Sequence, residues 1–167
     1  SEIFGTLQAN GQVYLFNQAG IMVGPSGVIN TRGFVASTLG ISDDSFLKNA
    51  RLTLSGDSEA SIKNLGKISA QEGNVFLIAR TVENAGSISA PGGTVGLGGV
   101  TEVILGDDSG GIEVSYGNGA SVNNSGSIEA ASAELKAAGG NVYALAINNS
   151  GVVRATTLAN EGGKIVL

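Results

Sequence analysis

The chain contains neither cysteine nor histidine. It therefore lacks the commonest zinc ligands, a thiol nucleophile, and the histidine of Ser-His-Asp and Cys-His arrangements. The lack of cysteine also means that packing rather than cross-links must stabilise the fold, which any compartment permits. These absences exclude most zinc sites and most nucleophilic hydrolases.

Charge is also scarce, because only 14% of the residues are charged and the formal net charge is −5. The nine Lys and Arg residues are scattered, whereas phosphate binding needs them clustered, so we expect no nucleic-acid partner. No apolar run approaches the roughly 18 residues that span a bilayer. The first residues show no signal-peptide pattern, so we expect any such signal to be removed or to lie upstream.

Only two prolines accompany 27 glycines among the 167 residues. The glycines follow no strict three-residue period, which excludes collagen. Hydrophobic residues make up 42% of the chain, and many are Val, Ile and Leu, which argues against simple disorder. Abundant glycine together with β-branched residues predicts an all-β domain with many tight turns.

Two short phrases recur along the chain. The first, Gly-x-Val-x-Leu or a close variant, occurs at residues 11–15, 73–77, 93–97, 140–144 and 163–167. The second, Asn-x-Gly-x-Ile-x-Ala or a close variant, occurs at residues 64–70, 84–90, 124–130 and 149–155. Gly66 and Gly86 lie 20 residues apart, as do Val75 and Val95. A period near 20 with two or three short strands per period is typical of a β-solenoid.

Stacked coils would pair each strand with its copies above and below, and alternate residues would point inward. We expect Ile68, Ala70 and their counterparts in the other repeats to face the core. Parallel strands joined by crossovers favour a right-handed path. The predicted fold is therefore an all-β, right-handed parallel β-helix with about 20 residues per coil. Roughly eight coil-equivalents would fit, fewer where residues enter insertions.

We predict a single domain over residues 1–167, with irregular insertions near 40–60 and 100–119. Strands are expected around Ile3–Leu7, at Arg51–Ser55 and over Ala130–Ala138. The second insertion is expected to form a hairpin or a strand pair, Thr101–Leu105 and Ile112–Tyr116. Both chain ends continue the repeat rather than cap it, so we expect the chain to be part of a longer protein.

The turn residues of the second phrase predict a structural ladder at one corner. Asparagine tolerates a corner conformation and can hydrogen-bond along its own stack, and glycine accepts a positive φ. The ladder would comprise Asn64, Asn84, Asn124, Asn149, Gly66, Gly86, Gly126 and Gly151. The alternative is ligand contact or glycan attachment, because Asn123 and Asn148 satisfy the acceptor pattern. Recurrence at fixed spacing favours the structural role.

The first phrase is apolar on both sides of its strand, so something should cover its outward side. The outward positions are Tyr14, Phe76, Tyr143 and Val166. One hypothesis is a cover from residues 40–60 or 100–119. The other is an interaction face for a lateral partner or ligand.

Acidic residues are sparse and fall in predicted turns rather than in one column. Asp43 and Asp44 could bind calcium, but a cap on a helical turn within Ile41–Lys48 is favoured. Asp107 and Asp108 leave the same alternative open against a solvated turn. We predict no catalytic residues, no metal site and no cofactor.

The stretch Ala9–Leu39 resembles the haemagglutination-activity domain of filamentous-haemagglutinin-type two-partner-secretion exoproteins. The later phrases are similar to the continuation of that domain, so the resemblance covers nearly the whole chain. Asn17-Gln18-Ala19-Gly20 corresponds to the family's Asn-Pro-Asn-Gly motif without its proline. The family's more N-terminal Asn-Pro-Asn-Leu phrase and capping strands have no counterpart here.

The resemblance implies a right-handed parallel β-helix and export through an outer-membrane β-barrel transporter. It also implies a secreted or cell-surface protein of a Gram-negative-type bacterium. Our main hypothesis is a structural or adhesive surface rod that contacts host or neighbouring-cell molecules or glycans and stacks end to end into filaments. The alternative is a secretion-recognition module for the transporter.

A polysaccharide-active β-helix enzyme is the least favoured hypothesis. Such enzymes need clustered carboxylates, or calcium beside a basic residue. Arg80 and Glu83 lie near one corner, but a surface ion pair explains them.

Overall fold

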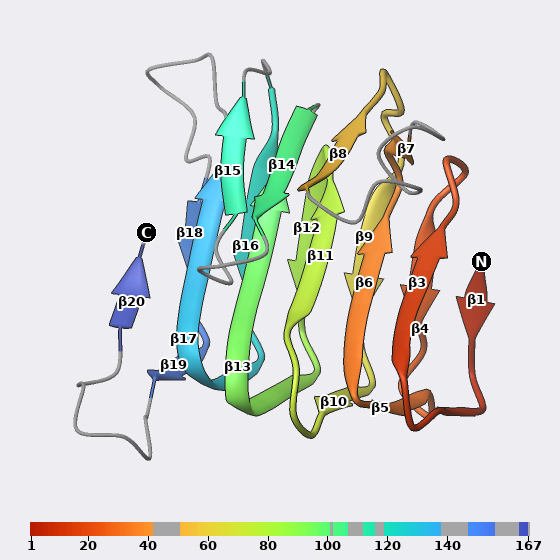
Figure 1. Cartoon of the computed structure of the whole chain (residues 1–167), viewed down its shortest axis with the longest axis vertical. Helices are drawn as coiled ribbons and strands as arrows, with labels where there is room; N and C mark the ends of the chain where they lie inside the picture. The colour runs from red at the N-terminus through yellow and green to blue at the C-terminus, as the bar shows by residue number, and fades with distance from the viewer. Residues whose placement is uncertain are drawn as a thin grey trace.

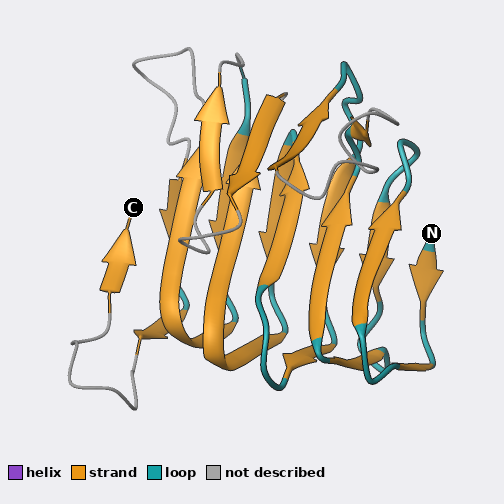
Figure 2. Cartoon of the chain, in the orientation of Figure 1, coloured by secondary structure: helices purple, strands orange, loops and turns teal. Residues whose placement is uncertain are grey.

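A computed structural model describes residues 1–41, 51–100, 102–106, 112–115, 119–137, 147–155 and 164–166. Within these ranges every regular element is a β-strand (Figure 2). The described residues contain no helix long and apolar enough to cross a membrane. The all-β prediction is confirmed, and parallel pairing dominates the ladders.

The strands form three faces around one apolar core, and the strands within each face run parallel (Figure 1). Face 1 contains β1 (Glu2–Ile3), β4 (Ile21–Val23), β9 (Ser61–Asn64), β12 (Thr81–Asn84), β16 (Ser121–Asn124) and β18 (Ile147–Asn149). Face 2 contains β2 (Thr6–Gln8), β5 (Val28–Thr31), β10 (Lys67–Ala70), the first parts of β13 (Ser87–Gly99) and β17 (Ser127–Ala137), and β19 (Val152–Ala155). Face 3 contains β3 (Gln12–Phe16), β6 (Gly33–Ser37), β11 (Val75–Ala79), the later parts of β13 and β17, and β20 (Lys164–Val166).

Each coil contributes one strand segment to each face, and the described strands make six coils. Face 2 closes the bottom of the view in Figure 1. Because β13 and β17 bend from face 2 into face 3 without a break, these two faces form one hydrogen-bonded sheet. The right-handed course and a uniform coil of about 20 residues stay predictions.

The register stacks like residues on like residues, as the repeat predicts. The central inward column of face 2 consists of Leu7, Ile29, Ile68, Ile88, Ile128 and Val153. Its four isoleucines are at most 1% exposed. Ala70, Ala90 and Ala130 are fully buried beside them. The inward positions predicted for the described repeats are thereby confirmed.

The two segments that interrupt the repeat pair with each other. They form an antiparallel sheet in the order β15 (Ile112–Ser115), β14 (Glu102–Gly106), β8 (Arg51–Ser55) and β7 (Gly40–Ile41). We call it the cover sheet, and it lies at the top of Figure 1. The described residues form six coils rather than eight, because these segments leave the stack.

A second apolar cluster lies between the cover sheet and the outward side of face 3. Phe76 and Ile78 of face 3 contribute to it, together with Leu54 of β8. Leu54 and Ile78 are fully buried, and Phe76 is 5% exposed. At β11 face 3 is therefore buried on both sides, which explains why this strand is apolar throughout.

One predicted strand boundary is wrong. A single strand around Ile3–Leu7 was expected, but β1 ends at Ile3 and β2 begins at Thr6 on another face. The Phe4-Gly5 step turns the corner between them. The strand predicted over Ala130–Ala138 is confirmed, since β17 extends to Ala137. The helical turn proposed for Ile41–Lys48, with Asp43 and Asp44, and the residues Asp107 and Asp108 lie outside the described residues.

Candidate functional site

The structure places the four ladder asparagines in one hydrogen-bonded column. The amide nitrogen of Asn64 donates to the side-chain oxygen of Asn84 at 2.8 Å, and Asn84 donates to Asn124 at 2.8 Å. Asn124 donates in turn to Asn149 at 2.7 Å. Asn64, Asn84 and Asn124 are at most 1% exposed. These three buried amides satisfy one another and have a packing role, whereas Asn149 at the end of the column is exposed.

The ladder glycines stack beside this column, but not for the expected reason. Positive φ values occur, within the described ranges, at Gly20 and Gly119 and not at Gly66, Gly86 or Gly126. A Cβ on Gly86 would instead collide with the main chain of Gly66, and one on Gly126 with the main chain of Gly86. Glycine is required here because successive coils approach too closely for a side chain, not because the corner needs a left-handed residue.

The family-like motif forms a tight turn between β3 and β4. The side-chain oxygen of Asn17 accepts the amide of Ala19 at 3.0 Å, and its carbonyl accepts the amide of Gly20 at 3.0 Å. Gly20 has a φ of 106°, which glycine tolerates best. Gln18 and Ala19 are exposed at the tip. The motif therefore presents an ordered turn even without the proline.

The outward residues of face 3 do not form one open surface. The register aligns Tyr14, Phe76 and Val166 in a column through Val35, Gly96 and Glu134. The cover sheet buries Phe76, whereas Tyr14 is 45% exposed and stacks on Phe16 with ring centroids 6.4 Å apart. Tyr143 lies outside the described residues, and only the backbone of Val166 is described.

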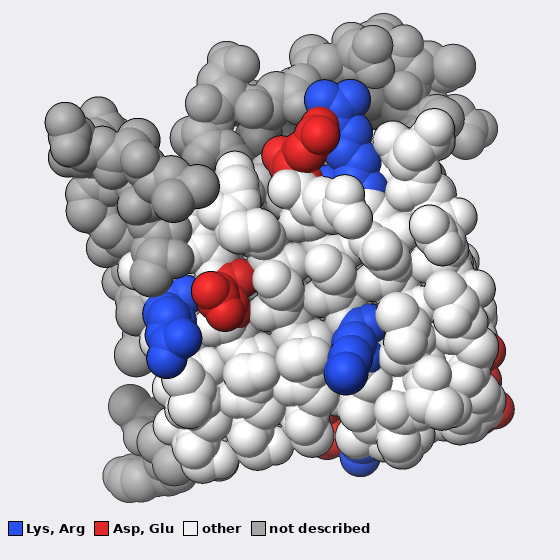
Figure 3. Space-filling model, turned by 90° about the horizontal axis from the view of Figure 1, so that it is seen from below, with Lys and Arg blue, Asp and Glu red and all other residues white. Residues whose placement is uncertain are grey.

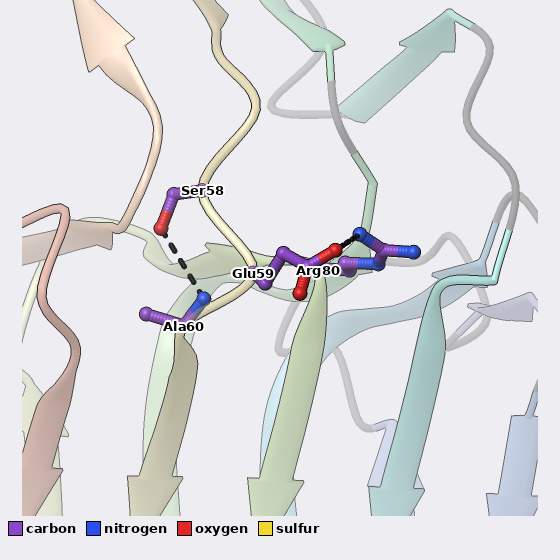
Figure 4. Close-up of polar contacts among 4 residues, drawn as sticks. All are labelled: Ser58, Glu59, Ala60 and Arg80. Atoms are coloured by element: carbon purple, nitrogen blue, oxygen red, sulfur yellow. Dashed lines mark hydrogen bonds and ion pairs between the residues drawn. The ribbon is translucent and has the colours of Figure 1, made fainter.

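The charged residues form isolated ion pairs. Arg80 bonds Glu59 at 2.6 Å (Figure 4), and Lys63 bonds Glu83 at 3.0 Å. A pair between Arg80 and Glu83 was expected and is wrong, because Glu83 lies beside Lys63 in the parallel register of face 1. Beside the first pair, the hydroxyl of Ser58 accepts the amide of Ala60 at 3.3 Å and fixes the turn before β9 (Figure 4).

Such exposed pairs contribute about 0–1 kcal/mol each and form no catalytic arrangement. In the part of the chain that the structure describes, no group of three or more acidic residues could hold a metal ion.

A polar cleft of about 280 Å³ follows face 2 at its corner with face 3, along the first three coils. Its polar lining residues are Gln8, Asn10, Asn30, Thr31, Arg32, Gln71 and Glu72. The amide of Gln71 donates to the side-chain oxygen of Asn30 at 3.2 Å, and Arg32 pairs with Glu72 at 3.1 Å. Sequence reasoning missed this cleft, because its residues belong to three different coils and to no recurring phrase.

The family comparison and the structure comparison agree with each other. The family model of the TPS secretion domain matches residues 1–167. Among solved structures, the chain is similar to the crystal structure of the HMW1 secretion domain from Haemophilus influenzae, with 30% sequence identity and a TM-score of 0.78. The match covers 93% of this chain and 42% of that one, so this chain spans about two fifths of its length. None of the curated protein sequences matches the chain.

The resemblance seen at Ala9–Leu39 is thereby confirmed as far as two-partner secretion, while its haemagglutinin-type detail is not specific. TPS domains belong to proteins that are secreted through outer-membrane transporters, and they are not an enzyme family. The matches favour the secretion-recognition hypothesis over the adhesive rod. Because the family model spans every residue, this chain belongs to the TPS secretion domains of two-partner-secretion exoproteins.

Proposed function

We propose that this chain is the module by which an outer-membrane β-barrel transporter recognises a two-partner-secretion exoprotein and exports it. The observation that carries the proposal is the family match over residues 1–167. The absence of cysteine supports it. A chain without cysteine cannot be locked by disulfides in an oxidising compartment, so it can stay unfolded until it has passed a pore.

Secretion of a reporter tests this proposal. The chain would be placed between a cleavable signal peptide and a small monomeric reporter, and the fusion expressed with and without the transporter. We expect the reporter in the medium only when both the chain and the transporter are present. The control replaces the chain by a shuffled sequence of the same composition. Equal release of the shuffled fusion would refute recognition by this module.

A structural rod is the second candidate function. The observation that favours it is the register, which stacks like residues on like residues from coil to coil, as Ile68 on Ile88. A quasi-one-dimensional stack of repeats can be extended by further coils in the same register. Electron microscopy of the purified chain at high concentration tests this function. Filaments would support it, and dispersed particles only would count against it.

Adhesion to host molecules or glycans would be a further property of such a rod. The face of the molecule seen from below Figure 1 carries only a few charged side chains, of both signs (Figure 3). A contact there would depend on hydrogen bonds and shape rather than on net charge.

A further inference from the structure

The part of the polar cleft that the second and third coils form differs from the rest of the stack. In the second coil the inward position at the end of the face 2 strand holds Thr31. Later coils hold Ala70, Ala90 and Ala130 in the same column. The hydroxyl of Thr31 is buried and has no hydrogen-bond partner among the described residues. Since the core accepts alanine at this position, packing does not demand the hydroxyl.

The corner that follows departs from the pattern as well. The third coil turns it with Gln71 and Glu72. The fourth coil turns it with Pro91 and Gly92, whose side chains have no hydrogen-bonding group. β5 lies between β2 and β10, and β10 lies between β5 and β13, so these departures are inside the stack rather than at its end. Departures from a local pattern that packing does not demand are expected at functional sites.

Two side-chain amides in this part of the cleft orient each other. The amide nitrogen of Gln71 donates to the side-chain oxygen of Asn30 at 3.2 Å, from one coil to the next. Within the described residues, no hydrogen bond engages the amide nitrogen of Asn30 or the side-chain oxygen of Gln71. The pair therefore presents a donor and an acceptor side by side, both available to a ligand.

The rest of the lining limits what can bind. Arg32 and Glu72 pair at 3.1 Å and neutralise each other, so a strongly charged ligand gains little. Ala9 is the one apolar residue among the described lining residues, so a lipid chain or an apolar peptide side chain meets no matching surface. The volume of about 280 Å³ is near the lower end of the range for small-molecule sites, roughly 300–1,000 Å³. The cleft therefore suits a small, neutral ligand rich in hydrogen-bonding groups.

We propose that this cleft binds an uncharged carbohydrate outside the cell. Each hydroxyl group of a sugar both donates and accepts, so two neighbouring hydroxyls match the donor of Asn30 and the acceptor of Gln71. The cleft joins residues of three coils, so it forms only when the exported chain folds, and its ligand is met after secretion. In this timing alone the inference rests on the proposed secretion function.

The lining also predicts how tightly the sugar binds. None of the described lining residues is aromatic, so the ring gains no stacking energy and is held by hydrogen bonds alone. We therefore expect a dissociation constant of about 1 mM.

Titration of the purified, isotopically labelled chain with sugars, followed by nuclear magnetic resonance, tests the cleft. The probes are glucose, galactose, mannose, N-acetylglucosamine and lactose, which are all uncharged. We expect at least one of them to cause saturable shifts in the main-chain amide signals of residues 30–32 and 71–72. N-acetylneuraminic acid is the charged comparison and should bind more weakly. If none of the neutral sugars causes a saturable shift, the proposal is overturned.

A pair of double variants locates the binding. Asn30→Ala/Gln71→Ala removes the amide pair, and we expect about tenfold weaker binding, since two hydrogen bonds are lost. The matched control is Asn123→Ala/Asn148→Ala, which removes two amides that are also neighbours in adjacent coils, on face 1. Each pair has one half-buried and one exposed member. The control should bind like the unchanged chain. Circular dichroism verifies folding, and Gln71→Ala alone is the second cleft variant, with several-fold weaker binding expected.

The outcomes separate this inference from the secretion function. Binding is measured without a transporter, so a chain that binds no sugar can still direct secretion, and a chain that fails in secretion can still bind a sugar. Unchanged binding in both cleft variants, or an equal loss in the cleft and control variants, would overturn the assignment to the cleft. Tighter binding of N-acetylneuraminic acid than of the neutral sugars would overturn the uncharged ligand.

Discussion

The stacked coils and the cover sheet bury their side chains in different ways. In the coils, a buried residue lies on its own counterpart from the next repeat, as Ile68 lies on Ile88. In the cover sheet, Leu54 pairs with Val103, although no repeat relates the two segments. The coils form a nearly one-dimensional stack, whereas the cover sheet is one layer held on face 3 by a single apolar cluster.

This difference predicts how far the destabilising effect of a substitution extends through the structure. A change at a coil corner lies between two coils and acts on both, since each repeat contacts only its neighbours. A change in the cover sheet acts on the second cluster and leaves the main core intact. Four substitutions test this contrast, from the largest expected effect to the smallest.

Gly86→Val should have the largest effect. Its side chain would meet main-chain atoms of Leu65 and Gly66, which cannot move without separating two coils. We expect a loss of about 3 kcal/mol or more in the free energy of unfolding, measured by urea denaturation. The matched control is Gly11→Ala, because a Cβ there would have no atom of the described residues within 4 Å. A comparable loss at Gly11 would show that the effect is not steric.

Leu54→Ala should destabilise the cover sheet. Leu54 is fully buried in the second cluster, and deletion of such a side chain costs about 2–5 kcal/mol. We expect hydrogen exchange to accelerate in β7, β8 and β14 but not in β9, β10 or β12. Equal acceleration in the coils would mean that the two regions unfold as one unit, against the proposed contrast.

Asn84→Ala should interrupt the asparagine column in its middle. Asn64 loses its acceptor and Asn124 its donor, both in buried positions. Leaving such groups unpaired costs about 1–3 kcal/mol, so we expect a loss of about 2 kcal/mol in thermal or urea unfolding. Asn123→Ala is the control, because this neighbour is only half-buried and should change stability by less than about 0.5 kcal/mol.

Thr38→Val should stabilise the chain slightly. The hydroxyl of Thr38 is buried and has no hydrogen-bond partner among the described residues, so its removal relieves a desolvation penalty. We expect a gain of about 1 kcal/mol in the free energy of unfolding. Ser37→Ala serves as the opposite control, because the Ser37 hydroxyl accepts the amide of Leu39 at 2.9 Å. A loss of stability in Thr38→Val would show that the hydroxyl has a partner after all.

The coils could be predicted from sequence because the spacing of the repeat phrases indicates which residues of successive coils pair. The spacing of Asn64 and Asn84 indicates that they stack, and alternation places Ile68 inward. The reason for the glycines could not be predicted, because a sequence holds no distance between coils. The corner at Phe4-Gly5 was missed because that step lacks the Asn-x-Gly phrase.

The cover sheet and the cleft could not be predicted from the repeat. Pairing of Ser55 with Glu102 is a long-range contact between unrelated segments, so the sequence predicts separate insertions rather than one sheet. The burial of Phe76 and the exposure of Tyr14 follow from where that sheet lies. A signal for the cleft was present, however. An alignment of the repeats places Gln71 against Pro91 and Ala131, and amides in one coil without counterparts mark a special corner.

The direction of the asparagine column has a further consequence. Isoleucine and alanine alternate inward along face 2, so sliding a coil by two residues would keep apolar side chains in the core. The asparagine side chains disfavour this two-residue shift, because Asn84 donates to Asn124 only when their strands align residue for residue. Every amide also donates toward the later coil, so the column has one polarity. The column therefore disfavours coils that are out of register, because a shifted coil would leave buried amides unpaired.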